Sequence, residues 1–237
     1  MLTPTFTVCA LFFGDYPDLA KRCLDPIVAG RPAGTDLRIG TNAIGDATRS
    51  YLNGVVLNNP LTRWYDAPTN IYKYPLMRQM VLDPVQPILS EFVVWFDDDS
   101  CILPAYQATW WSRLAEATTD DVDMLGLPYQ ITWNGEQRQW VRQQLWYNGK
   151  DPARRNSIRF FTGGWWCCRT ELLRKFNYPW PELKHNGGDT MLGELAFQQN
   201  WRRKTFATGL AINAGPSLQH STASRRGFSE RPIGARI

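Results

Sequence analysis

The chain has 237 residues, a formal net charge of +4 and a hydrophobic content of 43%, which is the composition of a globular protein with one sizeable core. Its five cysteines form no CxxC pair, and Cys167 and Cys168 are adjacent, so the pattern favours neither a disulfide framework nor a structural zinc site. We therefore expect a single domain over residues 1–237 in a reducing compartment.

The first predicted element is a buried strand over residues 6–13, where the side chains form a continuous apolar run. This run is too short to span a membrane and lacks the pattern of a signal peptide. We expect no membrane partner and a cytoplasmic location. A helix should follow, with Asp18 near its start and a stop at residues 30–32.

A second strand is predicted over residues 37–44, with Asn42 and Asp46 at its carboxyl end, where open α/β sheets bind ligands. Residues 74–89 look helical despite two prolines. Residues 92–96 are again continuously apolar and predict another buried strand.

The second half of the chain is less regular. We expect a helix after Pro104 that includes Trp110, Trp111 and Leu114, a short strand at residues 123–127, and a variable excursion over residues 131–159, such as a hairpin. A strand at 160–168 and helices at 170–176 and 189–201 complete the pattern. The fold class is therefore α/β, with a mixed, mainly parallel central sheet flanked by helices.

The strongest chemical signal is the triplet Asp97-Asp98-Asp99, which directly follows the apolar strand. Clustered carboxylates repel one another unless a cation compensates, so a hard divalent metal that bridges to phosphate oxygens is a natural partner. An acidic turn that caps the next helix is the alternative.

A second signal is Gly187-Gly188-Asp189, with Glu194 five residues later. Two glycines let the backbone approach a ligand closely, and a carboxylate at a helix start can take a proton from an incoming hydroxyl. A plain helix N-cap is the alternative. A third signal is His220, which could complete a metal site but could equally be an ordinary surface or core residue.

Aromatic and basic residues leave two interpretations open. The 11 Trp, 11 Phe and 9 Tyr suit platforms for sugar rings or bases, and equally a core rich in tryptophan. The basic groups could hold a diphosphate or a nucleic-acid backbone, or form solvated faces. These groups are Arg154, Arg155 and Arg159; Arg202, Arg203 and Lys204; and Arg225, Arg226, Arg231 and Arg236.

Taken together, these motifs resemble the GT-A glycosyltransferases, especially glycosyltransferase family 2. The resemblance rests on the apolar first strand with its loop at residues 13–17, the DxD-like triplet, the Gly-Gly-Asp before a helix and the late histidine. Their order and spacing cover nearly the whole chain.

The resemblance implies a role for each matching residue. Mn²⁺ or Mg²⁺ would be bound by Asp97 and Asp99, with Asp99 as the main ligand, and by His220. Asp189 would be the catalytic base, with Glu194 as a rival. The sugar-nucleotide donor would be bound by Phe13, Asp15, Asn42, Asp46, Asp98, Gly163, Gly164, Arg225 and Arg226.

The expected activity is transfer of a sugar from a nucleoside-diphosphate sugar, a UDP-sugar in the first instance, to an acceptor hydroxyl. Inversion follows if Asp189 is the base, while a retaining outcome stays open. The chain is also similar to phage-encoded glycosyltransferases that modify hydroxymethylated pyrimidines, which implies 5-hydroxymethylcytosine in DNA as acceptor and the host cytoplasm as location. Glycan or protein acceptors, a nucleotidyltransferase and a non-catalytic nucleic-acid-binding module are the alternatives.

Overall fold

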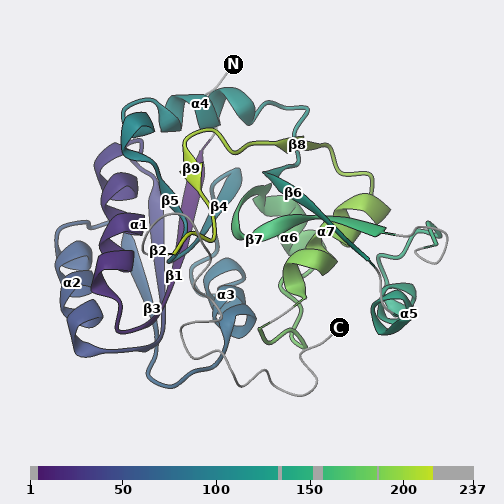
Figure 1. Ribbon diagram of the computed structural model, residues 1–237, viewed down its shortest axis with the longest axis horizontal. Coiled ribbons are helices and arrows are strands. Elements are labelled where there is room, and N and C mark those ends of the chain that lie inside the picture. Colours follow the sequence, from purple (N-terminus) through teal and green to yellow (C-terminus); the bar gives the residue numbers. More distant parts are fainter. Residues whose placement is uncertain (1–4, 133–134, 152–156, 186, 216–237) are drawn as a thin grey trace.

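The computed structural model describes residues 5–132, 135–151, 157–185 and 187–215. Its main sheet has the strand order β3-β2-β1-β4-β7-β6-β8 (Figure 1). The strands are β1 (Phe6–Gly14), β2 (Asp36–Ile44), β3 (Thr62–Ala67), β4 (Phe92–Asp97), β6 (Met124–Thr132), β7 (Ser157–Arg169) and β8 (Arg203–Thr205). The helices are α1 (Pro17–Gly30), α2 (Asp46–Leu57), α3 (Lys73–Val81), α4 (Trp110–Ala117), α5 (Gly135–Gln143), α6 (Thr170–Lys175) and α7 (Gly188–Gln198).

Strand β1 is apolar at almost every position because both faces of the sheet are covered. Phe6 and Val8 pack in a hydrophobic cluster with residues of α1, α2 and α4. Cys9 and Leu11 point to the opposite face, into a cluster with residues of α3, α5, α6 and α7. The chain therefore forms three layers, with the sheet between two sets of helices, as the sequence predicts.

The direction of the strands changes across the sheet. Strands β1, β2, β3 and β4 are mutually parallel where they pair, whereas β7 is antiparallel to both β4 and β6. Because β2 and β4 lie on opposite sides of β1, the carboxyl ends of β1 and β4 form the point where the strand order reverses. Ligands of open α/β sheets bind at such a point.

Several predicted elements have different bounds in the structure. The predicted helix over residues 74–89 is wrong in its second half, since α3 ends at Val81 and Pro84 and Pro87 lie in the connection to β4. Proline lacks the N–H that a helix interior needs. The helix predicted after Pro104 is confirmed as α4, which begins at Trp110, and one 3₁₀ turn precedes it.

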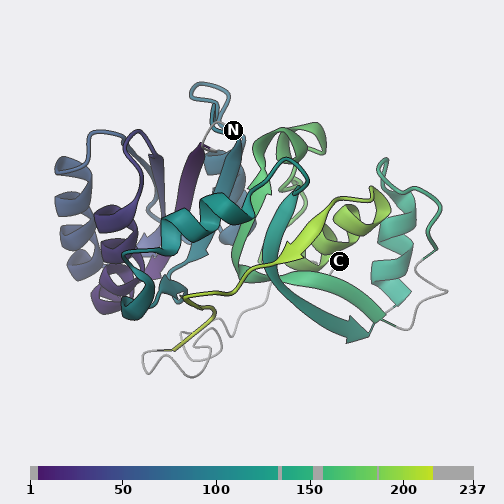
Figure 2. The same ribbon diagram turned by 90° about the horizontal axis from the view of Figure 1, so that it is seen from above.

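The excursion predicted over residues 131–159 combines a hairpin and a helix. Strands β6 and β7 do pair antiparallel, up to Thr132 opposite Ser157, so the strand predicted at residues 123–127 is longer than expected. Helix α5 lies in their connection. Figures 1 and 2 show α5 at the end of the molecule opposite to α1 and α2.

The tryptophans in the described part of the chain belong mainly to the core. Trp95, Trp110, Trp165 and Trp166 are each at most 1% exposed, and they contact other rings of the two hydrophobic clusters. Most of the aromatic excess is therefore packing, and the alternative of sugar-binding platforms is not needed to explain it.

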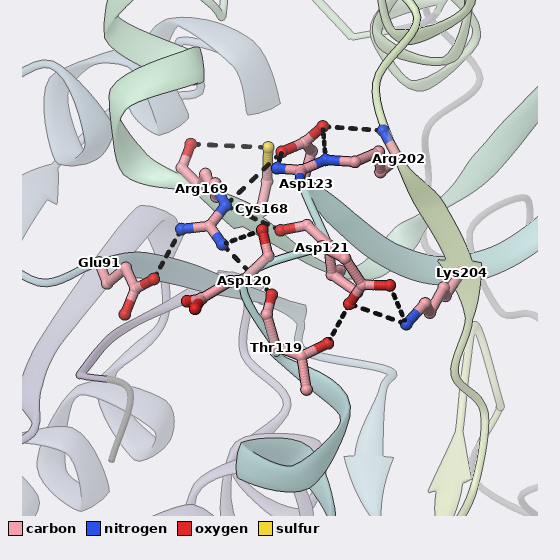
Figure 3. Close-up of polar contacts among 10 residues, drawn as sticks. Glu91, Thr119, Asp120, Asp121, Asp123, Cys168, Arg169, Arg202 and Lys204 are labelled. Carbon is pink, nitrogen blue, oxygen red and sulfur yellow. Dashed lines mark hydrogen bonds and ion pairs between the residues drawn. The ribbon is translucent and has the colours of Figure 1, made fainter. Parts of the chain in front are cut away.

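A network of hydrogen bonds and ion pairs connects neighbouring segments at the end of the sheet opposite to the Asp triplet (Figure 3). Arg169, the last residue of β7, donates to the Glu91 carboxylate at 2.6 Å and to the carbonyl of Val122 at 2.8 Å. The same guanidinium reaches the carbonyls of Thr119 and Asp120 at 3.2 Å. One side chain thus joins the beginning of β4, the end of β7 and the turn before β6.

The basic group at residues 202–204 takes part in the same network (Figure 3). Arg202 donates to both carboxylate oxygens of Asp123, at 3.1 and 2.7 Å, and Lys204 pairs with Asp121 at 3.0 Å. These side chains serve to attach β8 to the sheet. No helix in the described part of the chain is long and apolar enough to cross a membrane.

Candidate functional site

The candidate site lies where β1 and β4 end side by side. The backbone N–H of Phe13 donates to the carboxylate of Asp98 at 3.4 Å, which joins the two strand ends. Asp98 and Asp99 are only 6% and 4% exposed. The triplet is therefore a partly buried acidic cluster at the ligand-binding edge of the sheet, rather than a solvated helix cap.

Both carboxylate oxygens of Asp97 are held by protein donors. The indole N–H of Trp95 donates to Oδ1 at 2.8 Å, and the ammonium of Lys73 donates to Oδ2 at 2.6 Å. Lys73 also donates to the carbonyl of Gly163 at 2.7 Å. Asp97 is thereby fixed in one orientation by a lysine that the sequence analysis did not single out.

The loop before α3 delivers Lys73 to this position. Tyr72 has a φ of +70°, which L-residues rarely adopt, and it directly precedes the lysine. Asn42, buried at the end of β2, accepts the N–H of Ile71 at 2.8 Å and donates to Asn70 at 2.9 Å. Asn42 therefore holds this loop, and its predicted contact with the nucleotide stays a prediction.

Gly163 and Gly164 lie in an irregular part of β7, where the pairing with β6 shifts register between Gly126 and Pro128. A Cβ on Gly163 would be 3.2 Å from the Lys73 ammonium and 3.4 Å from an oxygen of Asp189. Bulges of this kind are common beside active sites. The glycine leaves open the space between an ammonium and a carboxylate.

Gly164 is needed for a different contact. A Cβ there would be 2.0 Å from the side-chain oxygen of Asn213 and 2.8 Å from that of Ser100. Asn213 follows a short two-stranded sheet of β5 (Cys101–Ile102) and β9 (Leu210–Ala211). Gly164 thus lets the C-terminal part of the described chain approach the Asp triplet.

Asp189 stands at the start of α7, and the two preceding glycines place it there. Gly187 has a φ of +86°, in the left-handed region that favours glycine. Gly188 covers the ring of Tyr74, whose atoms would lie 2.3 to 2.7 Å from a Cβ at this position. The Tyr74 hydroxyl in turn accepts the backbone N–H of Asp189 at 2.9 Å.

The environment of Asp189 suits a general base. Burial raises the pKa of the Asp189 carboxyl above its ordinary value, and the charge of Asp97 acts in the same direction. The positive charge of Lys73 and nearby backbone N–H groups oppose that rise in pKa. A carboxylate with a raised pKa accepts a proton more readily than an ordinary aspartate.

Glu194 is placed differently, although it belongs to the same helix. Its side chain is 0% exposed and accepts a hydrogen bond from Gln198 at 2.7 Å. Gln198 continues to the carbonyl of Lys150 and the N–H of Asn148, in the connection after α5. Glu194 therefore anchors this connection, and the geometry favours Asp189 over its rival as the base.

Two other predicted ligands lie at the rim of this edge. Asp15 is exposed and accepts the N–H of Thr48 at 2.9 Å, so it caps α2 from the loop between β1 and α1. Asp46 is also exposed, in the first turn of α2. These two carboxylates are close in sequence to the site but do not belong to the group around Asp97 and Asp189.

The chain returns to the triplet near its described end. The N–H of Ala214 donates to the carbonyl of Asp99 at 2.7 Å, and Arg22 on α1 donates to the carbonyls of Ala214 and Gly215 at 2.8 and 2.7 Å. The remaining predicted ligands follow this segment and lie outside the described residues. They are His220, Arg225 and Arg226.

Among the described residues, no three His, Cys, Asp or Glu side chains come together as a metal-binding group. Hard cations such as Mg²⁺ are, however, commonly held by one or two carboxylates together with substrate phosphates. Because Lys73 and Trp95 hold both oxygens of Asp97, a cation at this residue would have to compete with these two donors.

Lys73 and Tyr74 are the site residues that sequence reasoning missed. They lie in a helix whose apolar pattern indicates only packing, and their function depends on contacts with residues 24 to 115 positions away. The single local signal is one lysine at the start of a segment with several apolar residues. From the sequence alone, such a lysine cannot be distinguished from an ordinary surface charge.

No protein-family model and no curated protein matches the sequence. Solved structures do match. A mannosyltransferase from Pyrobaculum calidifontis, in complex with GDP-Man and Mn²⁺, aligns over 86% of this chain and 55% of its own, with a TM-score of 0.59 and 16% identity. GalNAc-T7, with UDP, GalNAc and Mn²⁺, aligns over 86% and 42%, with a TM-score of 0.60 and 11% identity.

TarS of S. aureus, residues 1–349 in complex with UDP-GlcNAc, aligns over 86% of this chain and 56% of its own, with a TM-score of 0.57 and 16% identity. The chain thus spans about half the length of these structures or less. At such identities the likeness concerns the fold alone. The chain has the α/β fold of these GT-A-type glycosyltransferases, as the sequence predicts.

Proposed function

We propose that this chain is a glycosyltransferase that moves a sugar from a nucleoside-diphosphate sugar to an acceptor hydroxyl. The observation that carries the proposal is the position of Asp189, which faces the Lys73–Asp97 pair across Gly163 at the point where the strand order reverses. The fold shared with transferases that bind GDP-Man or UDP-GlcNAc supports it.

In the proposed reaction, Asp189 takes the proton of the acceptor hydroxyl while that oxygen forms a bond to the anomeric carbon of the donor sugar. The bond from this carbon to the diphosphate oxygen breaks, and its electron pair leaves with the nucleoside diphosphate. Attack from the side opposite the leaving group inverts the anomeric carbon. A general base of this kind contributes typically about 10²- to 10⁴-fold to the rate.

The donor nucleotide is proposed to lie along the ends of β1 and β2, as in the prediction from sequence, with UDP as the first candidate. The residues that would hold a divalent cation are Asp99 and, in the segment after Gly215, His220. When bound, Mn²⁺ or Mg²⁺ would supply positive charge against the diphosphate that leaves.

The proposal for Asp189 is tested with the variant Asp189→Asn, which keeps the size of the side chain but cannot take a proton. We expect kcat for transfer to fall by about 10²- to 10⁴-fold, with little change in the Kd of the donor. The exposed Asp18→Asn on α1 is the matched control and should leave kcat unchanged. If Asp189→Asn keeps its activity and Glu194→Gln loses it, the assignment of the base is wrong.

The same assignment predicts a pH dependence. Because the pKa of Asp189 is raised by burial, the base is protonated at a higher pH than an ordinary aspartate, whose pKa is about 3.9. We expect kcat/KM to fall as the pH drops through this raised pKa, and the acid limb to disappear in Asp189→Asn. An acid limb that persists unchanged in the residual activity of the variant would contradict it.

The acceptor is proposed to be a hydroxyl compound, and 5-hydroxymethylcytosine in DNA is the specific candidate from the sequence resemblance. The direct test compares single-stranded and duplex DNA that contain this base with the same DNA that contains cytosine, and with glycan acceptors. Sugar incorporation into the hydroxymethylated DNA alone would support the DNA acceptor, whereas incorporation only into glycans would contradict it.

A further inference from the structure

The space above Gly163 is bordered by groups of opposite charge. The ammonium of Lys73 and a carboxylate oxygen of Asp189 lie 3.2 and 3.4 Å from the position that a Cβ on Gly163 would take. A single methyl group there would therefore touch both. Because residue 163 is glycine, no side chain of its own comes between the ammonium and the carboxylate.

Lys73 has one hydrogen-bond donor more than its protein acceptors use. An ammonium carries three N–H groups. In the described part of the chain it donates to Asp97 at 2.6 Å and to the carbonyl of Gly163 at 2.7 Å, and its side chain is 12% exposed. One N–H of Lys73 therefore remains for a further acceptor, on a side chain that is partly exposed.

Two aromatic rings and the loop before α3 also hold the Lys73 ammonium in place. It lies 5.8 Å from the ring centroids of both Tyr74 and Trp95, within the range of cation–π contacts. The strained backbone at Tyr72 and the hydrogen bonds of Asn42 to the same loop fix the start of α3. Strained residues of this kind persist mainly where the site needs them, and a preorganised donor loses little entropy when it binds.

We propose that Lys73 is a donor-specificity residue whose third N–H donates to a hydroxyl group of the sugar being transferred, in the space above Gly163. This inference rests on the proposed function, since it requires a donor sugar bound beside Lys73 and Asp189 with one hydroxyl group within reach of the ammonium. In this subsite, Asp97 is the residue that orients Lys73. The ligand class is a hexose with a free hydroxyl, attached to a nucleoside diphosphate.

The test is a comparison of Lys73→Met with the wild type by isothermal titration calorimetry, with UDP, UDP-glucose and UDP-N-acetylglucosamine in the presence of Mn²⁺. Loss of a hydrogen bond to a charged group should weaken binding of the UDP-sugar by about 10- to 100-fold. The Kd of UDP itself should change by no more than about twofold. The exposed Lys21→Met on α1 is the matched control and should bind both ligands like the wild type.

Monodeoxy donors show whether a hydroxyl is the partner. Removing the hydroxyl that Lys73 binds should weaken donor binding in the wild type but add no further loss in Lys73→Met, because the two changes remove the same interaction. Lys73→Met leaves the charge of Asp97 uncompensated, so the double variant Lys73→Met/Asp97→Asn, which removes both charges, is measured beside it. Both variants are first compared with the wild type by Tm.

Equal loss of UDP and UDP-sugar binding in folded Lys73→Met would overturn the proposal, as would UDP-sugar binding at the wild-type level. In either case a wild type that still transfers sugar leaves the proposed function intact. If the wild type binds none of the nucleotide sugars, including GDP-mannose, the proposed function fails, and this inference fails with it.

Discussion

At the scale of single residues, the site depends on positions where a side chain would be too large. Gly188 has the ring of Tyr74 directly beneath it, and Tyr74 holds the backbone of Asp189. The sequence predicts that the Gly-Gly-Asp motif lets the backbone approach a ligand closely, and this stays a prediction. The group that Gly188 approaches, however, is a tyrosine from α3, which no local pattern could indicate.

This contact predicts opposite effects for two glycine substitutions. Gly188→Ala places a methyl group within 2.3 Å of the Tyr74 ring and should lower the free energy of unfolding by about 1–3 kcal/mol. Gly54→Ala, in α2 with no neighbour within 4 Å, should raise it by about 0.5–1 kcal/mol. Urea denaturation of both variants is the measurement. A Gly188→Ala protein as stable as the wild type would contradict the packing described.

At the scale of elements, the sequence predicted best those strands that are buried on both faces. Strands β1 and β4 are continuous apolar runs, because helices cover both sides of the sheet at these positions. Helix α2 buries only Thr48 and Leu52, and the edge strand β3 has one buried residue. Neither segment therefore has an apolar pattern clear enough to predict it from the sequence. The role of α3 was missed because it arises from contacts with β4, β7 and α7.

The sheet end opposite to the site yields an element-scale prediction. Arg169→Met removes the contacts that join β4, β7 and the turn before β6, and leaves the partly buried Asp123 with one partner fewer (Figure 3). We expect the free energy of unfolding to fall by about 1–3 kcal/mol, because partly buried acceptors lose a charged donor while Asp123 keeps its pair with Arg202.

Lys204→Met is the matched control, since its pair with Asp121 is exposed on both sides and should contribute at most about 1 kcal/mol. Chemical denaturation monitored by tryptophan fluorescence compares the two variants. Equal losses in both would show that Arg169 contributes no more than a surface pair. Donor binding should persist in each folded variant, because the network lies at the far end of the sheet from Asp97.

At the scale of the whole molecule, the site forms where two parts of the sheet meet. The parallel strands β1 to β4 supply the Asp triplet, and the antiparallel part with β6, β7 and α7 supplies Gly163 and Asp189. Helix α3 bridges them through Lys73 and Tyr74.

The central claim is that the site between these two parts of the sheet binds a sugar nucleotide with the help of a divalent cation. The most direct measurement is a thermal-shift series with UDP-glucose, UDP-N-acetylglucosamine, UDP-N-acetylgalactosamine and GDP-mannose, with and without Mn²⁺, on the wild type, Asp99→Asn and the exposed control Glu116→Gln. A ligand at 100 times its Kd stabilises the folded state by about 2.7 kcal/mol. The account predicts that at least one donor raises the Tm in a Mn²⁺-dependent manner in the wild type and in Glu116→Gln, but not in Asp99→Asn. It is contradicted if no donor raises the Tm, or if Asp99→Asn responds like the wild type.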